Sequence, residues 1–81
     1  MHSENKDYEI MEIINVDSSM IISIGYDQNN ATLQITFKSD HSVWHYYDVP
    51  ENVFRDFQYS GSKGKFFHSR IKGNYSEVRI G

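Results

Sequence analysis

Apolar and polar side chains alternate along much of the chain between residues 11 and 49. The alternation is cleanest in residues 31–38, where Leu33, Ile35 and Phe37 are separated by polar residues. A period of two is typical of a β-strand with one buried face. Short segments rich in Asp, Asn and Ser interrupt the pattern, and such residues favour turns. The pattern predicts an antiparallel meander with strands at residues 11–16, 20–27, 31–38 and 42–49.

Within the strand at residues 20–27, we expect Ile22, Ile24 and Tyr26 to share one face and Ile21 to lie on the other. In the strand at residues 42–49, the same alternation places Trp44 and Tyr46 together on one face. The other face then carries Val43, His45 and Tyr47.

The period changes at Pro50, a residue that the first turn of a helix accepts because it needs no backbone donor there. Apolar residues at helical spacing predict a helix over residues 50–59. A second helix is expected over residues 62–72, with Ser62 as its N-cap and Gly73 at its end. Its sheet-facing residues are predicted to be Phe66, Phe67 and Ile71, whereas its opposite side is predicted to carry Lys65, His68 and Lys72.

Residues 75–80 add a short edge strand to this pattern. The elements together predict an α+β fold, in which a small antiparallel meander of three to five strands is followed by two short helices packed on one face.

The composition fits one small folded domain. The chain has 81 residues, 38% hydrophobic and 15% aromatic, which is enough apolar surface for a compact core. Residues 1–10 are expected to be a flexible segment and residues 11–81 a single domain. The chain holds no cysteine, which excludes disulfides, thiolate zinc sites and cysteine nucleophiles. Without an apolar run of membrane-helix length or a signal peptide, we expect a cytoplasmic protein.

Charge is distributed unevenly along the chain. Residues 1–60 hold ten acidic and three basic residues and so carry −7, whereas residues 61–81 hold five basic residues and one acidic residue and carry +4. The basic segment predicts a positive patch that can meet an anion. The alternative is an ordinary solvated helix face whose charge is balanced by acidic residues elsewhere in the fold.

Several fragments, read in order, resemble the KTSC domain family. They are residues 16–19 (Val-Asp-Ser-Ser), 24–27 (Ile-Gly-Tyr-Asp), 33–37, 44–50, and 62–67 followed by Arg70-Ile71. The family's Tyr-x-Tyr and Asp-Val-Pro pattern falls on residues 44–50, with Trp44 in place of the first Tyr. The resemblance implies a domain of the kind found at the C-terminus of some lysyl-tRNA synthetases and as small stand-alone bacterial or phage proteins. It also brings the suggestion of RNA binding.

The segment Ser62-Lys63-Gly64-Lys65 is the strongest candidate for phosphate binding. A helix start offers unpaired backbone donors, a glycine allows close approach, and lysines add positive charge. Arg70 and Lys72 extend this basic side. The alternative is structural, with Ser62 as a cap, Gly64 in tight packing and Arg70 over an aromatic ring or paired with an Asp such as Asp48.

Trp44 and Tyr46 are candidates for stacking on nucleic-acid bases, because aromatic side chains two residues apart share one face of a strand. Stacking requires that face to be uncovered. The alternative is that both rings belong to the core, and the register of the strands decides between the two.

Catalysis has little support in the sequence. We find no nucleophile and base signature, no metal-ligand spacing and no cofactor loop, so neither a metal nor a cofactor is expected. The prediction is a non-catalytic binding module that binds RNA or another phosphate-bearing ligand through the basic C-terminal helix. The alternatives are a protein-interaction module and a binder of a small anionic metabolite or nucleotide.

Overall fold

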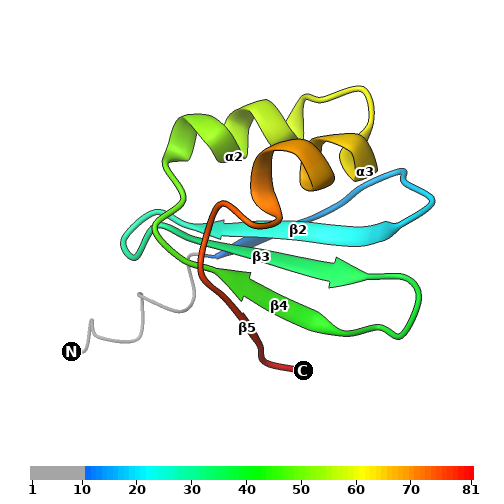
Figure 1. The fold of residues 1–81 in the computed structure, drawn as a ribbon, viewed down its shortest axis with the longest axis horizontal. Coiled ribbons are helices and arrows are strands. Elements are labelled where there is room, and N and C mark those ends of the chain that lie inside the picture. The colour runs from blue at the N-terminus through cyan, green and yellow to red at the C-terminus, as the bar shows by residue number, and fades with distance from the viewer. Residues whose placement is uncertain (1–10) are drawn as a thin grey trace.

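A five-stranded antiparallel sheet forms one layer of the fold (Figure 1). The computed structural model describes residues 11–81, so the prediction for residues 1–10 lies outside the described residues. The strands are β1 (Glu12–Asn15), β2 (Ile21–Asp27), β3 (Thr32–Phe37), β4 (Val43–Tyr46) and β5 (Glu77–Arg79). They lie side by side in chain order, which confirms the meander and the added edge strand.

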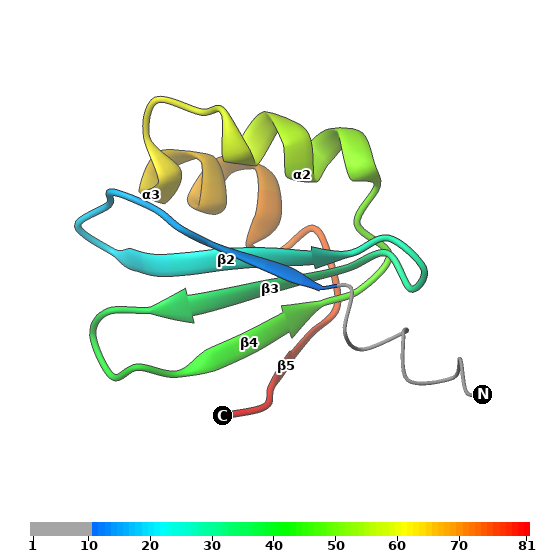
Figure 2. The same ribbon diagram turned by 180° about the vertical axis from the view of Figure 1, so that it is seen from behind.

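The helical layer lies between β4 and β5 in the chain and covers one face of the sheet (Figures 1 and 2). It consists of α2 (Glu51–Gln58), α3 (Lys63–Phe66) and the π-helical turn η2 (Phe67–Ile71). The predicted α+β class, with helices on one face of an antiparallel sheet, is confirmed.

The second helix differs from the regular helix that the sequence predicts. After α3 the backbone widens into η2, where the Lys72 N–H donates to the Phe67 carbonyl over 2.8 Å instead of to the residue four positions back. Phe67 and Ile71 are nevertheless buried as expected, and Gly73 ends the segment with a φ of +84°.

The core lies between the helices and one face of the sheet. The register pairs Leu33 with Tyr46 and Ile35 with Trp44, so Trp44 and Tyr46 lie on the face that the helices cover. Within residues 11–81 the core is one cluster of eleven buried residues: Ile21, Ile24, Tyr26, Leu33, Ile35, Tyr46, Val49, Val53, Phe57, Phe67 and Ile71.

The prediction for the start of β2 is wrong. A β-bulge lies between Ile21 and Ser23, where the register with β3 shifts by one residue. Because a bulge inserts an extra residue, it changes which side chains face the core. Ile21 is therefore fully buried in the core, and Ile22 is not part of that cluster.

The chain turns sharply from β4 into α2. Asp48 adopts a φ of 60°, a left-handed conformation that Asp tolerates better than most residues, and Pro50 is the N-cap of α2. The Tyr26 hydroxyl donates a hydrogen bond to the Val49 carbonyl and so ties this turn to β2. This link fixes the helical layer above the sheet.

Candidate functional site

The first part of the site is a hollow beside the N-terminal end of α3. Its volume is about 670 Å³, and it lies where α3 and η2 meet the turn between β1 and β2. We call it the Lys65 hollow. Its lining residues are Ser19, Met20, Ser62, Gly64, Lys65, His68 and Ser69. The Lys65 and His68 side chains come from the exposed side of the helical segment, as the sequence predicts.

The second part is a hollow of about 400 Å³ next to Trp44, which we call the Trp44 hollow. Phe67 and Tyr46 form its apolar interior, and Lys72, His68, Asp40 and Glu77 are its charged or titratable residues. The other lining residues are Met20, Phe37, Ser39, Ser42 and Trp44. The Trp44 indole Nε1–H donates to the Ser42 hydroxyl over 3.2 Å, which holds the ring in place.

The two hollows adjoin, because Met20 and His68 line both. The fold therefore brings Lys65, Lys72 and Trp44 to one continuous surface, which the predicted site residues Ser62, Gly64 and Tyr46 also line. Trp44 lies more than 15 residues from either lysine in the sequence, so no local pattern places them together. The arrangement places Lys72 in the same hollow as the Trp44 indole and Lys65 in the adjoining hollow.

Two other predicted phosphate contacts are engaged elsewhere. The Lys63 Nζ donates to the Ser60 carbonyl over 2.7 Å. The Arg70 guanidinium lies 5.0 Å from the centre of the Phe66 ring and 3.9 Å from the Asp56 carboxylate. Neither residue lines the two hollows. Arg70 lies over an aromatic ring, as the structural alternative has it, but its acidic partner is Asp56 and not Asp48.

Ser62 also has a structural role, whereas Gly64 does not show the tight packing that was the alternative for it. The Ser62 hydroxyl accepts a hydrogen bond from the Lys65 N–H over 3.3 Å, which confirms the predicted N-cap. This bond occupies one of the backbone donors that a phosphate was expected to use. A Cβ on Gly64 would lie 3.6 Å from the Met20 sulfur, which is an ordinary van der Waals distance, so packing does not require a glycine at this position.

Tyr46 cannot stack on a base. Only 2% of the residue is exposed, and its ring meets Phe67 edge-on with 5.9 Å between the ring centres. The core alternative is therefore the correct one for Tyr46, because the helices cover its face of the sheet. Trp44 lies on the same face but is only partly buried.

The opposite face of the sheet carries aromatic groups that the sequence analysis did not single out. His45 and Tyr47 lie there with their ring centres 6.2 Å apart, and His45 Nε2 is 2.8 Å from Gln34 Oε1. Burial lowers the pKa of His45, against the smaller opposing effect of the Asp27 charge. The alternation of residues 42–49 contained this signal, but only the position of the helices shows which face is open.

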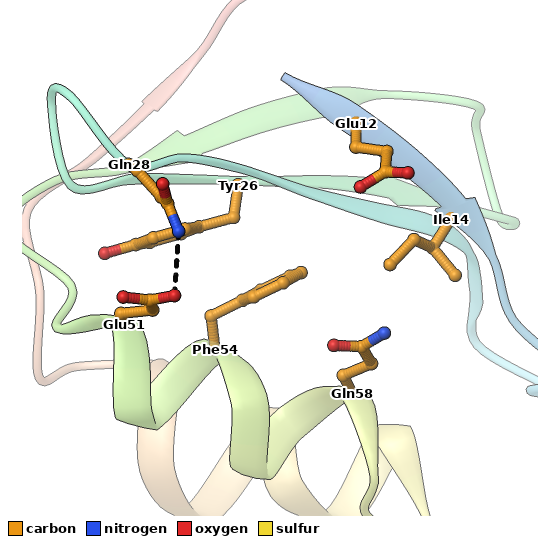
Figure 3. A pocket seen from close by; sticks show the side chains of 7 residues that line it. All are labelled: Glu12, Ile14, Tyr26, Gln28, Glu51, Phe54 and Gln58. Carbon is orange, nitrogen blue, oxygen red and sulfur yellow. Dashed lines mark hydrogen bonds between the residues drawn. The ribbon is translucent and has the colours of Figure 1, made fainter. Parts of the chain in front are cut away.

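A third cavity, of about 260 Å³, lies between α2 and the β1–β2 side of the sheet (Figure 3). The rings of Tyr26 and Phe54 stack there with centres 4.9 Å apart. Glu51 accepts a hydrogen bond from the Gln28 amide over 2.8 Å, and Glu12 also lines the cavity. Two carboxylates, Glu12 and Glu51, line this cavity, whereas the charged side chain of the Lys65 hollow is a lysine.

Residues 11–81 contain no group of three or more His, Asp or Glu side chains placed to hold a metal ion. Nor does any helix in this part of the chain have the length and apolar character needed to cross a membrane.

The comparisons with known proteins agree with the fold. The sequence model of the KTSC domain matches residues 17–75. A crystal structure of a KTSC domain protein from Yersinia pestis superposes with a TM-score of 0.84 and 41% sequence identity, covering 88% of this chain and 99% of that one. A protein from Tsukamurella paurometabola is 32% identical over 65 residues, which are 80% of this chain and 96% of that protein.

Longer relatives contain the same region. A lysine–tRNA ligase from Nostoc punctiforme is 34% identical over 70 residues, and one from Trichormus variabilis is 31% identical over 75 residues. These alignments cover 86% and 93% of this chain but only 12% and 13% of the ligases. The chain thus spans about an eighth of the length of these relatives.

Proposed function

The chain belongs to the KTSC domain family, and we propose that it is a non-catalytic binding module for a phosphate-bearing ligand, in particular RNA. The ligand lies across the Lys65 and Trp44 hollows. Lys65 and Lys72 contact phosphates, His68 lies between them, and the Trp44 ring contacts a base.

One observation carries this proposal: Lys65, Lys72 and Trp44 line two adjoining hollows that share Met20 and His68. Single-stranded RNA presents phosphates and bases alternately, so a ligand of this kind needs ammonium groups beside an aromatic ring. The names of the lysine–tRNA ligases among the relatives add support, because they associate this domain type with proteins that act on tRNA.

The available charge limits the affinity. Lys63 and Arg70 are engaged within the protein, whereas Asp40 and Glu77 line the Trp44 hollow and repel phosphate. For single strands, the logarithm of the binding constant falls with the logarithm of the salt concentration, with a slope of roughly 0.7 for each phosphate neutralised. Two phosphate contacts therefore predict a slope of about 1.4. We therefore expect weak binding that fades as salt rises.

The test is an NMR titration of the isotope-labelled full chain with a mixed-sequence single-stranded RNA of about 12 nucleotides, a length that one small domain can contact. The amides of Lys65 and His68 and the Trp44 indole signal are expected to shift together. Lys65→Gln and Lys72→Gln are each expected to weaken binding and to lower the salt slope by about 0.7.

Arg55→Gln provides the matched control, because it removes one positive charge from α2, where Arg55 pairs with Glu51 over 2.8 Å. Equal weakening by Arg55→Gln would show a general charge effect and contradict the site. A mononucleotide that saturates the same amides as readily as RNA would instead identify a small-anion site. No shift at millimolar RNA would refute the proposal.

A further inference from the structure

β5 forms an open edge of the sheet. Among residues 11–81 it pairs with β4 alone, at the end of the strand order, and all three of its residues are exposed. In both views of the fold its outer side faces away from β4 and from the helices (Figures 1 and 2). An unprotected edge of this kind presents backbone groups to another strand.

The hydrogen bonds to β4 show which backbone groups point outward. The Tyr47 N–H donates to the Ser76 carbonyl over 3.0 Å, and the Ile80 N–H donates to the Val43 carbonyl over 2.8 Å. Hydrogen-bonded pairs alternate along an antiparallel ladder, and Val78 lies opposite His45. The backbone N–H and C=O groups of Val78 therefore also point toward β4. The N–H and C=O groups of Glu77 and Arg79 therefore point to the free edge.

This edge is complementary to itself. If a second copy pairs antiparallel with β5 and the two-fold axis passes through Val78, Glu77 lies opposite the second copy's Arg79, and Arg79 lies opposite its Glu77. The backbone N–H and C=O groups of Glu77 and Arg79 point to the free edge. Each Glu77 therefore forms a backbone hydrogen-bonded pair with the Arg79 of the other copy. If the two-fold axis passed through Glu77 instead, Glu77 would lie opposite Glu77 of the second copy. If it passed through Arg79, Arg79 would lie opposite Arg79. Charge therefore selects one register.

The apolar side chains of this segment fit the same arrangement. Val78 and Ile80 are 48% and 50% exposed, which makes them two of the four exposed large hydrophobic residues in the described part of the chain. Val78 lies opposite His45, so it belongs to the sheet face without helices. When two copies pair, Val78 lies opposite Val78 of the second copy, and Ile80 lies diagonally beside that same Val78. The Val78 and Ile80 side chains of the two copies, four in all, then cover one another.

We infer that β5 is a self-association edge, through which two copies of this chain join their sheets into one antiparallel sheet. Both charged side chains already have a contact within the chain. Burial, and after it the nearby Glu77 carboxylate, raise the pKa of Tyr46, but Glu77 is exposed and a carboxylate has a second oxygen to accept from another copy. Arg79 lies 4.0 Å from Asp40 and donates through Nε to the Gly81 carbonyl, yet a guanidinium has five donors and this side chain is 54% exposed. Three residues bury far less than the roughly 800 Å² per partner of a stable interface, so the dimer is weak and depends on concentration.

The test measures the association of the full chain by sedimentation and by the concentration dependence of NMR shifts. Glu77→Arg and Arg79→Glu are each expected to raise the dimer dissociation constant about tenfold, because two attractive pairs become two repulsive pairs. A mixture of the two variants is expected to associate as the parent does, since opposite charges again face each other. The double variant is expected to recover self-association for the same reason.

Glu12→Arg makes the same charge change at the other edge of the sheet and is the control. It is expected to leave association unchanged, and a loss of association would place the contact at β1 instead. If a variant fails to fold, the parent chain still decides the question: exchange of the Glu77 and Arg79 amides must slow as concentration rises. No association at millimolar protein, or no recovery in the mixture, would overturn the inference.

Discussion

Trp44 and Tyr46 show how much the position of a single residue decides. They lie two residues apart on β4 and face the same side of the sheet, as the alternation in the sequence predicts. The ring of Tyr46 is covered by Phe67, whereas Trp44 is only partly buried and borders an open hollow. The sequence predicts that they share a face, but the reach of the helical layer decides which ring a ligand can touch.

His45, between these two residues, provides a prediction for the pH dependence of stability. Burial lowers the pKa of His45 below its ordinary value of 6.5. The unfolded state therefore takes up this proton at a higher pH than the folded state does, so the free energy of unfolding falls as the pH drops below 6.5. Urea unfolding at a series of pH values from neutral down to about pH 5.5 measures this slope.

His45→Gln is expected to reduce that slope, because glutamine does not titrate. His68→Gln is the control, since His68 is exposed on the helical segment. An unchanged slope in His45→Gln would contradict the assigned cause.

At the scale of elements, the contact between β1 and β2 depends on Gly25. A Cβ at this position would lie 2.6 Å from Ile13 Cδ1, the end of a half-exposed side chain that would have to turn away, and 3.1 Å from the Glu12 carbonyl oxygen, so the β1 backbone would have to shift slightly. We expect Gly25→Ala to lower the free energy of unfolding by about 1–3 kcal/mol, the usual range for overpacking. Chemical denaturation followed by circular dichroism measures this change.

Gly61→Ala is the matched control, because a Cβ there meets no atom of the described part of the chain within 4 Å. Ile13→Val removes the Cδ1 atom and is expected to restore part of the stability lost in Gly25→Ala. If Gly25→Ala is as stable as the parent chain, the close approach of β1 to β2 is wrong.

The helical segment at residues 63–71 shows a second effect at this scale. Apolar spacing predicts a helix here and correctly identifies Phe67 and Ile71 as buried. It does not predict the π-helical turn, in which the Lys72 N–H donates to the Phe67 carbonyl five residues back. The spacing of apolar residues indicates which side chains are buried, and it does not indicate where the backbone widens. The bulge at Ile21 is of the same kind, since it depends on the pairing of β2 with β3.

At the scale of the whole molecule, one core joins the two layers. Phe67 from the helical layer meets Phe37 and Tyr46 from the sheet, with ring centres 5.3 Å and 5.9 Å apart. We therefore expect a single cooperative unfolding transition. The fluorescence of Trp44, which reports on the sheet, and the far-ultraviolet circular dichroism, which reports on the helices, are expected to share one midpoint.

Phe67→Leu tests this coupling, because it removes the ring contacts with the sheet. Both midpoints are expected to fall by the same amount, whereas Tyr59→Leu, at a residue that is 77% exposed, is expected to leave them nearly unchanged. Separate midpoints would mean that the helical layer unfolds independently of the sheet.

The charge asymmetry also has a meaning at this scale. The basic segment after residue 60 meets acidic residues from the earlier part of the chain, since Arg70 lies 3.9 Å from Asp56 and Arg79 lies 4.0 Å from Asp40. Exposed pairs at such distances contribute little to stability. They do remove two cations from the expected positive patch, so Lys65 and Lys72 carry the proposed site.

The sequence by itself determined the elements and the fold class. Alternation predicted the strands, helical spacing predicted the helices, and Ser62 and Gly73 marked the ends of the second helical segment. These predictions succeed because each depends on residues only a few positions apart. The resemblance to the KTSC family is also confirmed. The sequence is enough to recognise it, because the motifs are local and occur in a fixed order.

The tertiary structure alone decided which side chains are available to a ligand. Only the register places Tyr46 under the helices, and only the packing of α2 brings Asp56 to Arg70. Trp44 and Lys72 border one hollow although nearly thirty residues separate them in the chain. Contacts between distant residues depend on the whole packed arrangement, and no local pattern of side chains encodes them.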